Sequence, residues 1–250
     1  MIKWLVVMLL SALVSLVGAY FRMTHELETS AVGATARVDR EIKNILNVID
    51  MLPSDPNCGD EVKREYANIA HENERIRAVG YIYDTGEQWH VCSMFGRQLS
   101  KLNYWRGSKK EGVFIGHSLL TVHFPETSFV VSKDKGKQKA FAYINPRRVL
   151  GYWIEPSLTY ANYSLTYANY SLTLDSDCVP FYTRSPVRMQ SMLLQTAHSE
   201  HHPYSIQATA SFVDVLKRAG IYWLRLMCIV GLGWISYRLL KGSLLQVVEK

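Results

Sequence analysis

Two long apolar segments, one near each end of the chain, constrain its fold more than any other feature. The first runs from Trp4 to Tyr20 without a charged residue. The second runs from Ile221 to Leu240, and Arg225 and Arg238 lie close enough to its ends for their side chains to reach lipid headgroups. At about 1.5 Å per residue, a helix of either length just crosses a hydrocarbon core of about 30 Å. Aromatic residues typical of membrane interfaces occur in both: Trp4, Tyr20, Tyr222, Trp223 and Tyr237.

The first apolar segment has a rival interpretation as a cleaved secretory signal, because a lone Lys3 precedes a short apolar run. No A-x-A cleavage site follows, so we interpret the segment as an uncleaved anchor. The flanking basic residues nearly balance, but three of the four cysteines lie between the two segments, which favours an exported middle. We predict a cytoplasmic N-terminus and first transmembrane helix over 1–22, an exported domain over 23–218, a second transmembrane helix over 219–240 and a cytoplasmic linker stub over 241–250.

Charge and motifs exclude several functions. The formal net charge of +6 is spread along the chain, and its densest basic patch (Lys133, Lys135, Lys137 and Lys139) alternates with other residues between two strand-like runs. That pattern is typical of a solvated hairpin, whereas nucleic-acid binding needs basic residues interleaved with aromatic ones on one surface. We therefore expect no nucleic-acid partner. The chain has no phosphate-binding glycine loop and no recognised nucleophile motif, and we predict no cofactor.

A histidine-rich run, His198-Ser199-Glu200-His201-His202, offers groups that bind zinc or copper. Adjacent positions on a chain point in different directions, and only His198 and His202 share the spacing of one helical turn. No further ligand is evident. We interpret the run as a polar loop leading to Pro203 and predict no metal site.

Helical periodicity follows the first apolar segment. From Thr24 to about Leu52 glycine and proline are scarce, and apolar residues recur every three or four positions at Val38, Ile42, Ile45, Ile49 and Leu52. Pro53 and Pro56 end this helix. A shorter helix is predicted from about Gly59 to Arg75, with Asp60 and Glu61 in its first turn and with Val62, Tyr66, Ile69 and Ala70 facing inward.

The period then changes from 3.6 to 2. Residues 78–84 and 88–94 predict a β-hairpin whose turn contains Gly86. Further strands are predicted over 112–124, 128–132, 139–144 and 149–154. Helices covering one face of an antiparallel sheet form an α+β fold, the general plan of PAS-like and Cache-like sensor domains outside the cytoplasm.

A tandem duplication follows: SLTYANY at 157–163 recurs at 164–170, and Ser171, Leu172 and Thr173 begin a third copy. The period is far below the roughly 20 residues or more of solenoid repeats. We interpret the segment as a tolerated surface loop.

The cysteines leave their pairing open. Cys58 precedes the second helix and Cys92 lies in the second hairpin strand, so the two sulfurs could lie on facing elements. A bond would close a loop of about 35 residues, worth on the order of 4 kcal/mol in the chain-entropy model. Alternatively Cys92 is a small buried apolar residue and Cys58 a free thiol. Cys178 is a competing partner for either.

These residues resemble a known family. The stretch from Cys58 through IRAVGYIYDTGEQWHVCSMFGRQL is similar to the CSS-motif domain, the periplasmic input module of bacterial EAL-type cyclic-di-GMP phosphodiesterases, which two transmembrane helices hold. The resemblance covers roughly Met1 to Leu240. Its most specific part is Cys92-Ser93 followed by Met94, where the family usually has serine. It implies that Cys92 is the motif thiol, Ser93 its motif neighbour and Cys58 the upstream partner in a redox-responsive periplasmic disulfide.

The resemblance also implies a setting. Residues 241–250 (KGSLLQVVEK) are similar to the linker that leads into an EAL domain, but the chain contains no EAL tripeptide. We therefore expect an input module in the bacterial inner membrane, with most of the chain in the periplasm and without catalytic activity of its own. Expected partners are the membrane, periplasmic thiol–disulfide oxidoreductases, and a second copy or full-length EAL relatives. Ser11, Ser15 and Ala19 have the small-residue spacing that suits helix pairing.

Two alternatives remain open. The chain could be the N-terminal fragment of a full-length cyclic-di-GMP phosphodiesterase. It could instead be a small-molecule sensor whose pocket is lined by aromatic residues of the sheet, namely Tyr81, Tyr83, Trp89, Tyr143 and Trp153.

Overall fold

The computed structural model describes residues 2–84, 89–99, 105–118, 128–145, 148–154, 169–174, 180–183 and 191–248. Helices are combined with antiparallel strands, which confirms the predicted α+β class. The chain divides into two compact units. The first contains Met1–Leu27, Met189–Leu194 and Ala210–Lys250, and the second contains Glu28–Arg188 and Gln195–Thr209.

Helix α1 (Ile2–Met51) is a single helix that supplies residues to both units, as the uninterrupted helical pattern predicts. Within the second unit one stripe of its surface is buried, which confirms the predicted face. In the first part of this stripe the buried residues are small, and the large aliphatic residues come later. The buried residues of the stripe are Ala31, Ala34, Thr35, Val38, Ile42, Ile45 and Ile49.

The C-terminal end of α1 is held by lysines of the predicted basic hairpin. The Lys135 ammonium donates hydrogen bonds to the carbonyl oxygens of Ile49 (3.0 Å) and Asp50 (2.9 Å), and the Lys133 ammonium lies 2.7 Å from the Asp50 carboxylate. Positive charge is favourable at this end of a helix, where carbonyls lack intrahelical partners. The predicted hairpin is therefore confirmed, but its lysines are not all simply solvated, because Lys133 and Lys135 bind α1.

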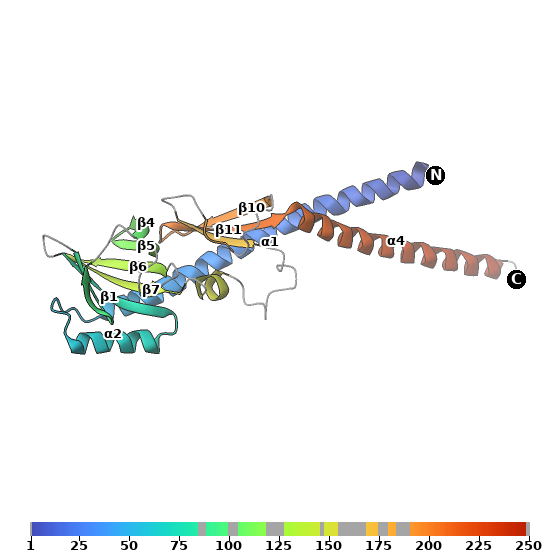
Figure 1. Ribbon diagram of the computed structural model, residues 1–250. Coiled ribbons are helices and arrows are strands. Elements are labelled where there is room, and N and C mark those ends of the chain that lie inside the picture. The colour runs from blue at the N-terminus through green and yellow to red at the C-terminus, as the bar shows by residue number, and fades with distance from the viewer. Residues whose placement is uncertain are drawn as a thin grey trace. The chain divides into compact units, whose positions relative to one another are not determined.

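The larger sheet belongs to the second unit and has seven antiparallel strands in the order β3-β2-β1-β7-β6-β5-β4 (Figure 1). The predicted hairpin is confirmed as β1–β2, with Asp84 opposite Trp89, and its turn at 85–88 lies outside the described residues. The strands are β1 (Ile76–Asp84), β2 (Trp89–Ser93), β3 (Gly96–Leu99), β4 (Trp105–Lys110), β5 (Val113–Ser118), β6 (Ser128–Lys135) and β7 (Gln138–Ile144).

The end of α1 and the start of α2 (Asp60–Glu72) lie over the same face of this sheet. The Tyr81 hydroxyl of β1 donates to the carbonyl oxygen of Leu52, just after α1. Lys133 and Lys135, which bind α1, point to the same face because Lys133 pairs with Ala140 and Ala140 pairs with Tyr81. Figure 1 shows α2 beside β1. The buried core on this face includes Val79, Tyr81, Ile115, Phe129, Val131, Ala140 and Ala142.

Aromatic rings gather on the opposite face. The Trp105 ring stacks on Phe114 with centroids 5.6 Å apart, and its indole nitrogen donates to the Tyr143 hydroxyl at 3.0 Å. Phe141 and Tyr143 lie 4.9 Å apart between centroids. These contacts join β4, β5 and β7 across the sheet.

Two sequence predictions fail in the second half of the chain. Residues 149–154 were expected as a strand but form a π-helix, η2 (Val149–Ile154), whose carbonyl oxygens at Trp153 and Ile154 accept hydrogen bonds from Arg37 of α1 at 3.1 and 3.0 Å. The end of the duplicated segment was expected as a loop, but Asn169–Leu174 forms strand β8, in which Leu172 is fully buried. Residues 155–168 lie outside the described residues.

Strand β8 belongs to a second sheet of four strands in the order β10-β11-β8-β9. Its other strands are β9 (Pro180–Thr183), β10 (Ser191–His198) and β11 (Tyr204–Ser211). The sequence analysis predicted none of the four strands of this sheet.

The first unit is built on the N-terminal half of α1 and on helix α4 (Phe212–Val248). Ser211 and Asp214 form a reciprocal cap at the start of α4. The two helices are joined by an Arg218–Glu26 ion pair at 2.9 Å and by a hydrogen bond of 3.0 Å from the Trp223 indole to Ser11. Each helix is long and apolar enough to cross a membrane. Of the small residues expected to pair helices, Ser15 and Ala19 are buried within this single chain.

Candidate functional site

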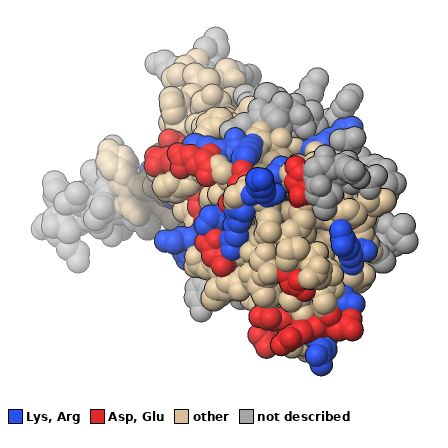
Figure 2. Space-filling view, turned by 90° about the vertical axis from the view of Figure 1, so that its left-hand side faces the viewer, with Lys and Arg blue, Asp and Glu red and all other residues tan. Residues whose placement is uncertain are grey.

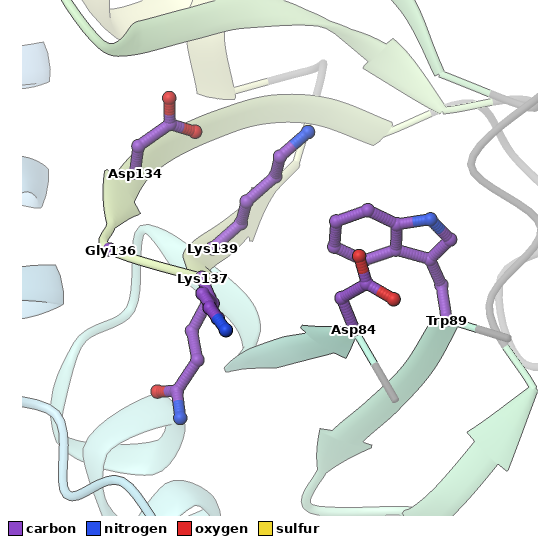
Figure 3. A pocket seen from close by; sticks show the side chains of 7 residues that line it. Asp84, Trp89, Asp134, Gly136, Lys137 and Lys139 are labelled. Atoms are coloured by element: carbon purple, nitrogen blue, oxygen red, sulfur yellow. The ribbon is translucent and has the colours of Figure 1, made fainter. Parts of the chain in front are cut away.

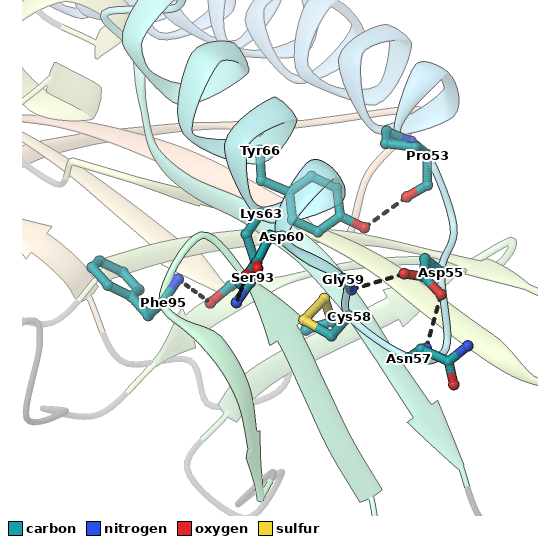
Figure 4. Close-up of a disulfide and its surroundings, with 11 residues drawn as sticks. Pro53, Asp55, Asn57, Cys58, Gly59, Asp60, Lys63, Tyr66, Ser93 and Phe95 are labelled. Atoms are coloured by element: carbon teal, nitrogen blue, oxygen red, sulfur yellow. Dashed lines mark hydrogen bonds and ion pairs between the residues drawn. A yellow bond between two sulfur atoms is a disulfide. The ribbon is translucent and has the colours of Figure 1, made fainter.

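The structure joins Cys58 and Cys92 in a disulfide that links the α1–α2 connection to strand β2 (Figure 4). The Cα atoms of the two cysteines lie 5.6 Å apart. Cys58 is 6% exposed and Cys92 is 1% exposed. Cys178 lies outside the described residues, and Cys228 is a free, exposed thiol in α4. The pairing that the spacing left open is thus the pairing found, while a redox role stays a prediction.

Asp55 shapes the backbone that presents Cys58. Its carboxylate accepts hydrogen bonds from the backbone N–H groups of Asn57 (2.9 Å) and Gly59 (2.8 Å), and its carbonyl oxygen accepts one from Cys58 (3.1 Å). These backbone donors, Gly59 first, lower the pKa of Asp55. The turn holds Cys58 at φ 56°, a left-handed conformation that is unusual for a residue with a side chain. Helix α2 begins directly after this turn.

Strand pairing positions Cys92. Cys92 lies opposite Tyr81 of β1 and Arg97 of β3, so its side chain points to the face covered by the start of α2. A Cβ atom on Gly80 would lie 2.1 Å from the Cys92 carbonyl oxygen, a distance that no real side chain tolerates. Glycine at position 80 therefore lets β1 and β2 approach each other at the disulfide.

Ser93, the motif neighbour, stabilises the turn that follows. Its hydroxyl accepts a hydrogen bond from the Phe95 backbone N–H at 3.2 Å (Figure 4). Gly96 completes the turn with φ 89°, which glycine adopts without strain. The chain thus reverses immediately after Cys92, and β3 can cover the outer edge of β2. In this geometry Ser93 takes no part in thiol exchange. It affects Cys92 only by fixing the turn that follows β2.

Buried tyrosines link the disulfide region to the end of α1. The Tyr66 hydroxyl of α2 donates to the Pro53 carbonyl at 2.6 Å, and the Tyr81 hydroxyl donates to the carbonyl of the preceding residue, Leu52. Burial, followed by the neighbouring Tyr83 and Tyr81, raises the pKa of Tyr66 well above its ordinary value. Tyr66 was predicted to face inward and is fully buried. The hydroxyl contacts could not be predicted because they depend on the connection between the helices.

The burial of both sulfurs limits their chemistry. Thiol–disulfide exchange requires a thiolate to approach one sulfur in line with the S–S bond. Because Cys58 and Cys92 are buried, a reductant gains access to the sulfurs only when the structure around them opens locally.

The predicted aromatic residues do not surround one pocket. Tyr81 and Tyr83 lie on the helix-covered face, whereas Trp89 and Lys139 line an open hollow of about 530 Å³ at the end of the sheet (Figure 3). In this hollow the Lys139 ammonium lies 5.3 Å from the centroid of the Trp89 ring. Trp153 lines another hollow of about 560 Å³. The lining of the first hollow is Asp84, Trp89, Asp134, Gly136, Lys137, Gln138 and Lys139.

The histidine-rich run lies in the connection between β10 and β11, not on a helix. His198 and His201 are exposed, whereas His202 is buried. Among the described residues, no group of three or more His, Cys, Asp and Glu side chains could hold a metal ion.

Charges of both signs are mixed on the face shown in Figure 2, without a continuous basic stripe. Ion pairs in the second unit include Lys63–Asp60 and Arg75–Glu41, both at 2.5 Å. The prediction that the chain has no nucleic-acid partner stays a prediction.

Comparisons with known proteins add little. No protein-family model matches the chain, and no curated protein matches it. Among solved structures, it is similar to the ligand-binding domain of the Campylobacter jejuni chemoreceptor Tlp3 in complex with L-norvaline. That similarity covers 80% of this chain and 94% of the other, with 10% sequence identity and a TM-score of 0.47. The resemblance to CSS-motif domains stays a prediction.

Proposed function

We propose that the chain is a membrane-anchored input module whose domain between the two apolar helices lies in the bacterial periplasm and responds to thiol–disulfide exchange at Cys58 and Cys92. The observation that carries the proposal is the disulfide itself, which ties the end of the α1–α2 connection to β2. Stable disulfides belong to oxidising compartments, and this one lies between two helices able to cross a membrane.

The proposed thiol–disulfide exchange balances in electrons and protons. A dithiol oxidoreductase attacks one sulfur of the Cys58–Cys92 bond, a mixed disulfide forms, and the second thiol of the oxidoreductase releases it. The two cysteines gain two electrons and two protons, and the oxidoreductase becomes the disulfide. Loss of the cross-link frees the loop between the cysteines, worth on the order of 4 kcal/mol in the chain-entropy model.

The effect of reduction would pass to α1. Asp55 and Pro53 lie between Cys58 and the end of α1, and Tyr66 and Tyr81 bind this connection. When Cys58 is released, the connection that follows the last turn of α1 loses its covalent attachment to β2. Because α1 also supplies the first apolar segment, its packing is the route by which a signal would reach the membrane.

Thiol counting on the full chain in native membranes tests the proposal. After acid quenching and alkylation with a polyethylene-glycol maleimide, we expect two modified thiols before reduction and four after it, since the chain has four cysteines. Cys58→Ala should release Cys92 and give three before reduction. Cys178→Ala and Cys228→Ala are matched controls that each remove one modified thiol and release none.

A second measurement separates a sensor from a structural cross-link. Amide hydrogen exchange over residues 38–51 should accelerate when the wild-type chain is reduced, and Cys58→Ala should show the reduced pattern without reductant. Two results would contradict the proposal: four free thiols in an oxidising periplasm, or amide hydrogen exchange in α1 that does not change when the disulfide is reduced.

The cyclic-di-GMP setting is the finer part of the proposal and rests on the resemblance of residues 58–99 and 241–250. Coexpression with full-length EAL relatives, followed by crosslinking through α1 and α4, tests pairing. If the chain is a fragment of such a phosphodiesterase, the DNA that follows codon 250 encodes EAL sequence in some frame.

A small-molecule sensor is the alternative, and the hollow beside Trp89 and Lys139 is the observation in its favour. Thermal shifts with metabolites that are unaffected by reductant but abolished by Trp89→Ala would support it over the redox function.

A further inference from the structure

A partly buried polar cluster attaches the β10–β11 connection to α1 within the second unit. The Asp39 carboxylate of α1 accepts hydrogen bonds from the Ser199 and Tyr204 hydroxyls, each at 2.7 Å. The Tyr204 hydroxyl oxygen also lies 3.2 Å from the Thr35 carbonyl oxygen, one turn earlier on α1, so its single proton is shared between the two acceptors. The Ser199 hydroxyl in turn accepts the His202 backbone N–H at 3.0 Å. One carboxylate on α1 thus organises the whole connection.

His202 lies in this cluster, but one of its ring nitrogens has no hydrogen-bond partner among the described residues. The residue is 9% exposed, and its Nδ1 atom is buried with no hydrogen-bond partner in the described part of the chain. The ionisable groups that face it are Asp39 from α1, His201 from the same connection and Lys110 from β4. Lys110 is held there because its ammonium donates to the Glu200 carbonyl oxygen at 2.5 Å.

We propose that residues 199–204 form an acid-sensitive latch on α1, which His202 keeps closed while its ring is neutral and opens when the ring gains a proton. Protonation places a second N–H donor and a positive charge on a buried ring whose Nδ1 atom has no hydrogen-bond partner among the described residues. The carboxylate that faces His202, Asp39, already accepts two hydroxyl donors at its Oδ1 atom, so turning towards His202 disturbs both bonds. Either His202 moves into solvent, or Asp39 turns to it and releases Ser199 and Tyr204. Both outcomes loosen the connection from α1.

The direction of the pH dependence follows from burial. Burial lowers the pKa of His202, His201 and Lys110 lower it further, and Asp39 opposes them. The folded state therefore binds fewer protons than the unfolded state below about pH 6.5. The stabilisation is complete above that pH and is lost as the pH falls towards the folded-state pKa. Since the latch needs no cysteine, it is independent of the proposed redox function.

Hydrogen exchange on the full chain in lipid nanodiscs tests the latch. The disulfide is first shown to be intact on a non-reducing gel. After correction for intrinsic rates, protection over 199–204 and over the α1 turns around Asp39 should fall between about pH 7.5 and pH 5. The expected fall is up to about tenfold for each pH unit below 6.5, until His202 is protonated in the folded state.

His202→Gln keeps a polar, uncharged side chain and should remove this response, whereas the matched control His201→Gln, at an exposed position of the same connection, should retain it. Wild-type protection that is equal at both pH values, or an unchanged response in His202→Gln, overturns the latch. If His202→Gln does not fold, histidine C2–H exchange in the wild type decides: a His202 pKa below about 6.5 supports the latch, and a value at or above that of free histidine overturns it.

Discussion

Asp55, Gly80 and Ser93 have no thiol, yet each determines part of the backbone at the disulfide. Asp55 holds the turn that presents Cys58, Gly80 allows β1 to approach the Cys92 carbonyl, and Ser93 closes the turn after β2. Of these, only Ser93 was identified beforehand, through the motif. The roles of Gly80 and Asp55 could not be predicted from the sequence, because they depend on how β1 pairs with β2 and on the turn before Cys58.

Gly80→Ala should lower the free energy of unfolding by about 3 kcal/mol, because the new Cβ atom would force β1 and β2 apart. Gly33→Ala is the control. It lies in helix α1 with its nearest contact at 3.6 Å, and it should be neutral or stabilising by about 0.5–1 kcal/mol. Denaturant unfolding of the purified chain measures both. Equal effects would show that the close approach at Gly80 does not matter.

Tyr66→Phe should lower stability by about 1 kcal/mol near neutral pH, because the bond to the Pro53 carbonyl is lost. The raised pKa of Tyr66 adds a pH dependence. Its stabilisation is present below about pH 10 and is lost above it, where the unfolded chain ionises first. The wild type should therefore lose stability more steeply than Tyr66→Phe above that pH. Parallel curves in unfolding experiments would contradict this assignment.

At the scale of elements, regular patterns were reliable and short apolar runs were not. The stripe of α1 and the alternation of β1 and β2 predicted those elements, because each pattern repeats over several residues. Residues 149–154 are apolar and short, so periodicity cannot distinguish a strand from a helical turn. The bonds from Arg37 to the Trp153 and Ile154 carbonyls satisfy the end of η2, and these are tertiary contacts.

The duplication offers a test at the same scale. Deleting residues 157–163 removes one copy and leaves the sequence of β8 unchanged, so the free energy of unfolding should change by no more than about 0.6 kcal/mol. Leu172→Ala should cost about 2–4 kcal/mol, because Leu172 is fully buried in β8. Denaturant unfolding compares the two variants. A deletion as costly as Leu172→Ala would mean that the first copy is part of the folded structure.

At the scale of the whole molecule, the two apolar helices are the segments that are long and apolar enough to cross a membrane. In the first unit α1 and α4 are joined by the Arg218–Glu26 pair, in which each side chain is 16% exposed, and by the Trp223–Ser11 bond. Polar contacts of this kind are favourable where water is scarce. The second unit carries the disulfide, the tyrosines and the Asp39 cluster.

Cysteine labelling tests the predicted topology. In a Cys178→Ala, Cys228→Ala background, Val32→Cys at an exposed position of α1 should react with a membrane-impermeant maleimide once the outer membrane is permeabilised. Ser243→Cys in the predicted cytoplasmic stub should react only after the inner membrane is disrupted. The opposite pattern would place the Cys58–Cys92 pair in the reducing cytoplasm, where such a bond does not persist.

The sequence by itself determined the two apolar helices, the long amphipathic stripe of α1, the α+β class and the two cysteines of interest, because these depend on composition and on periods within one element. The tertiary structure decided between the cysteine pairings that the spacing left open, and it alone decided that 149–154 is helical, that the end of the duplication is a strand and that His202 joins the cluster around Asp39. Each of these depends on contacts between residues far apart in the chain, where burial and hydrogen bonding outweigh local preference.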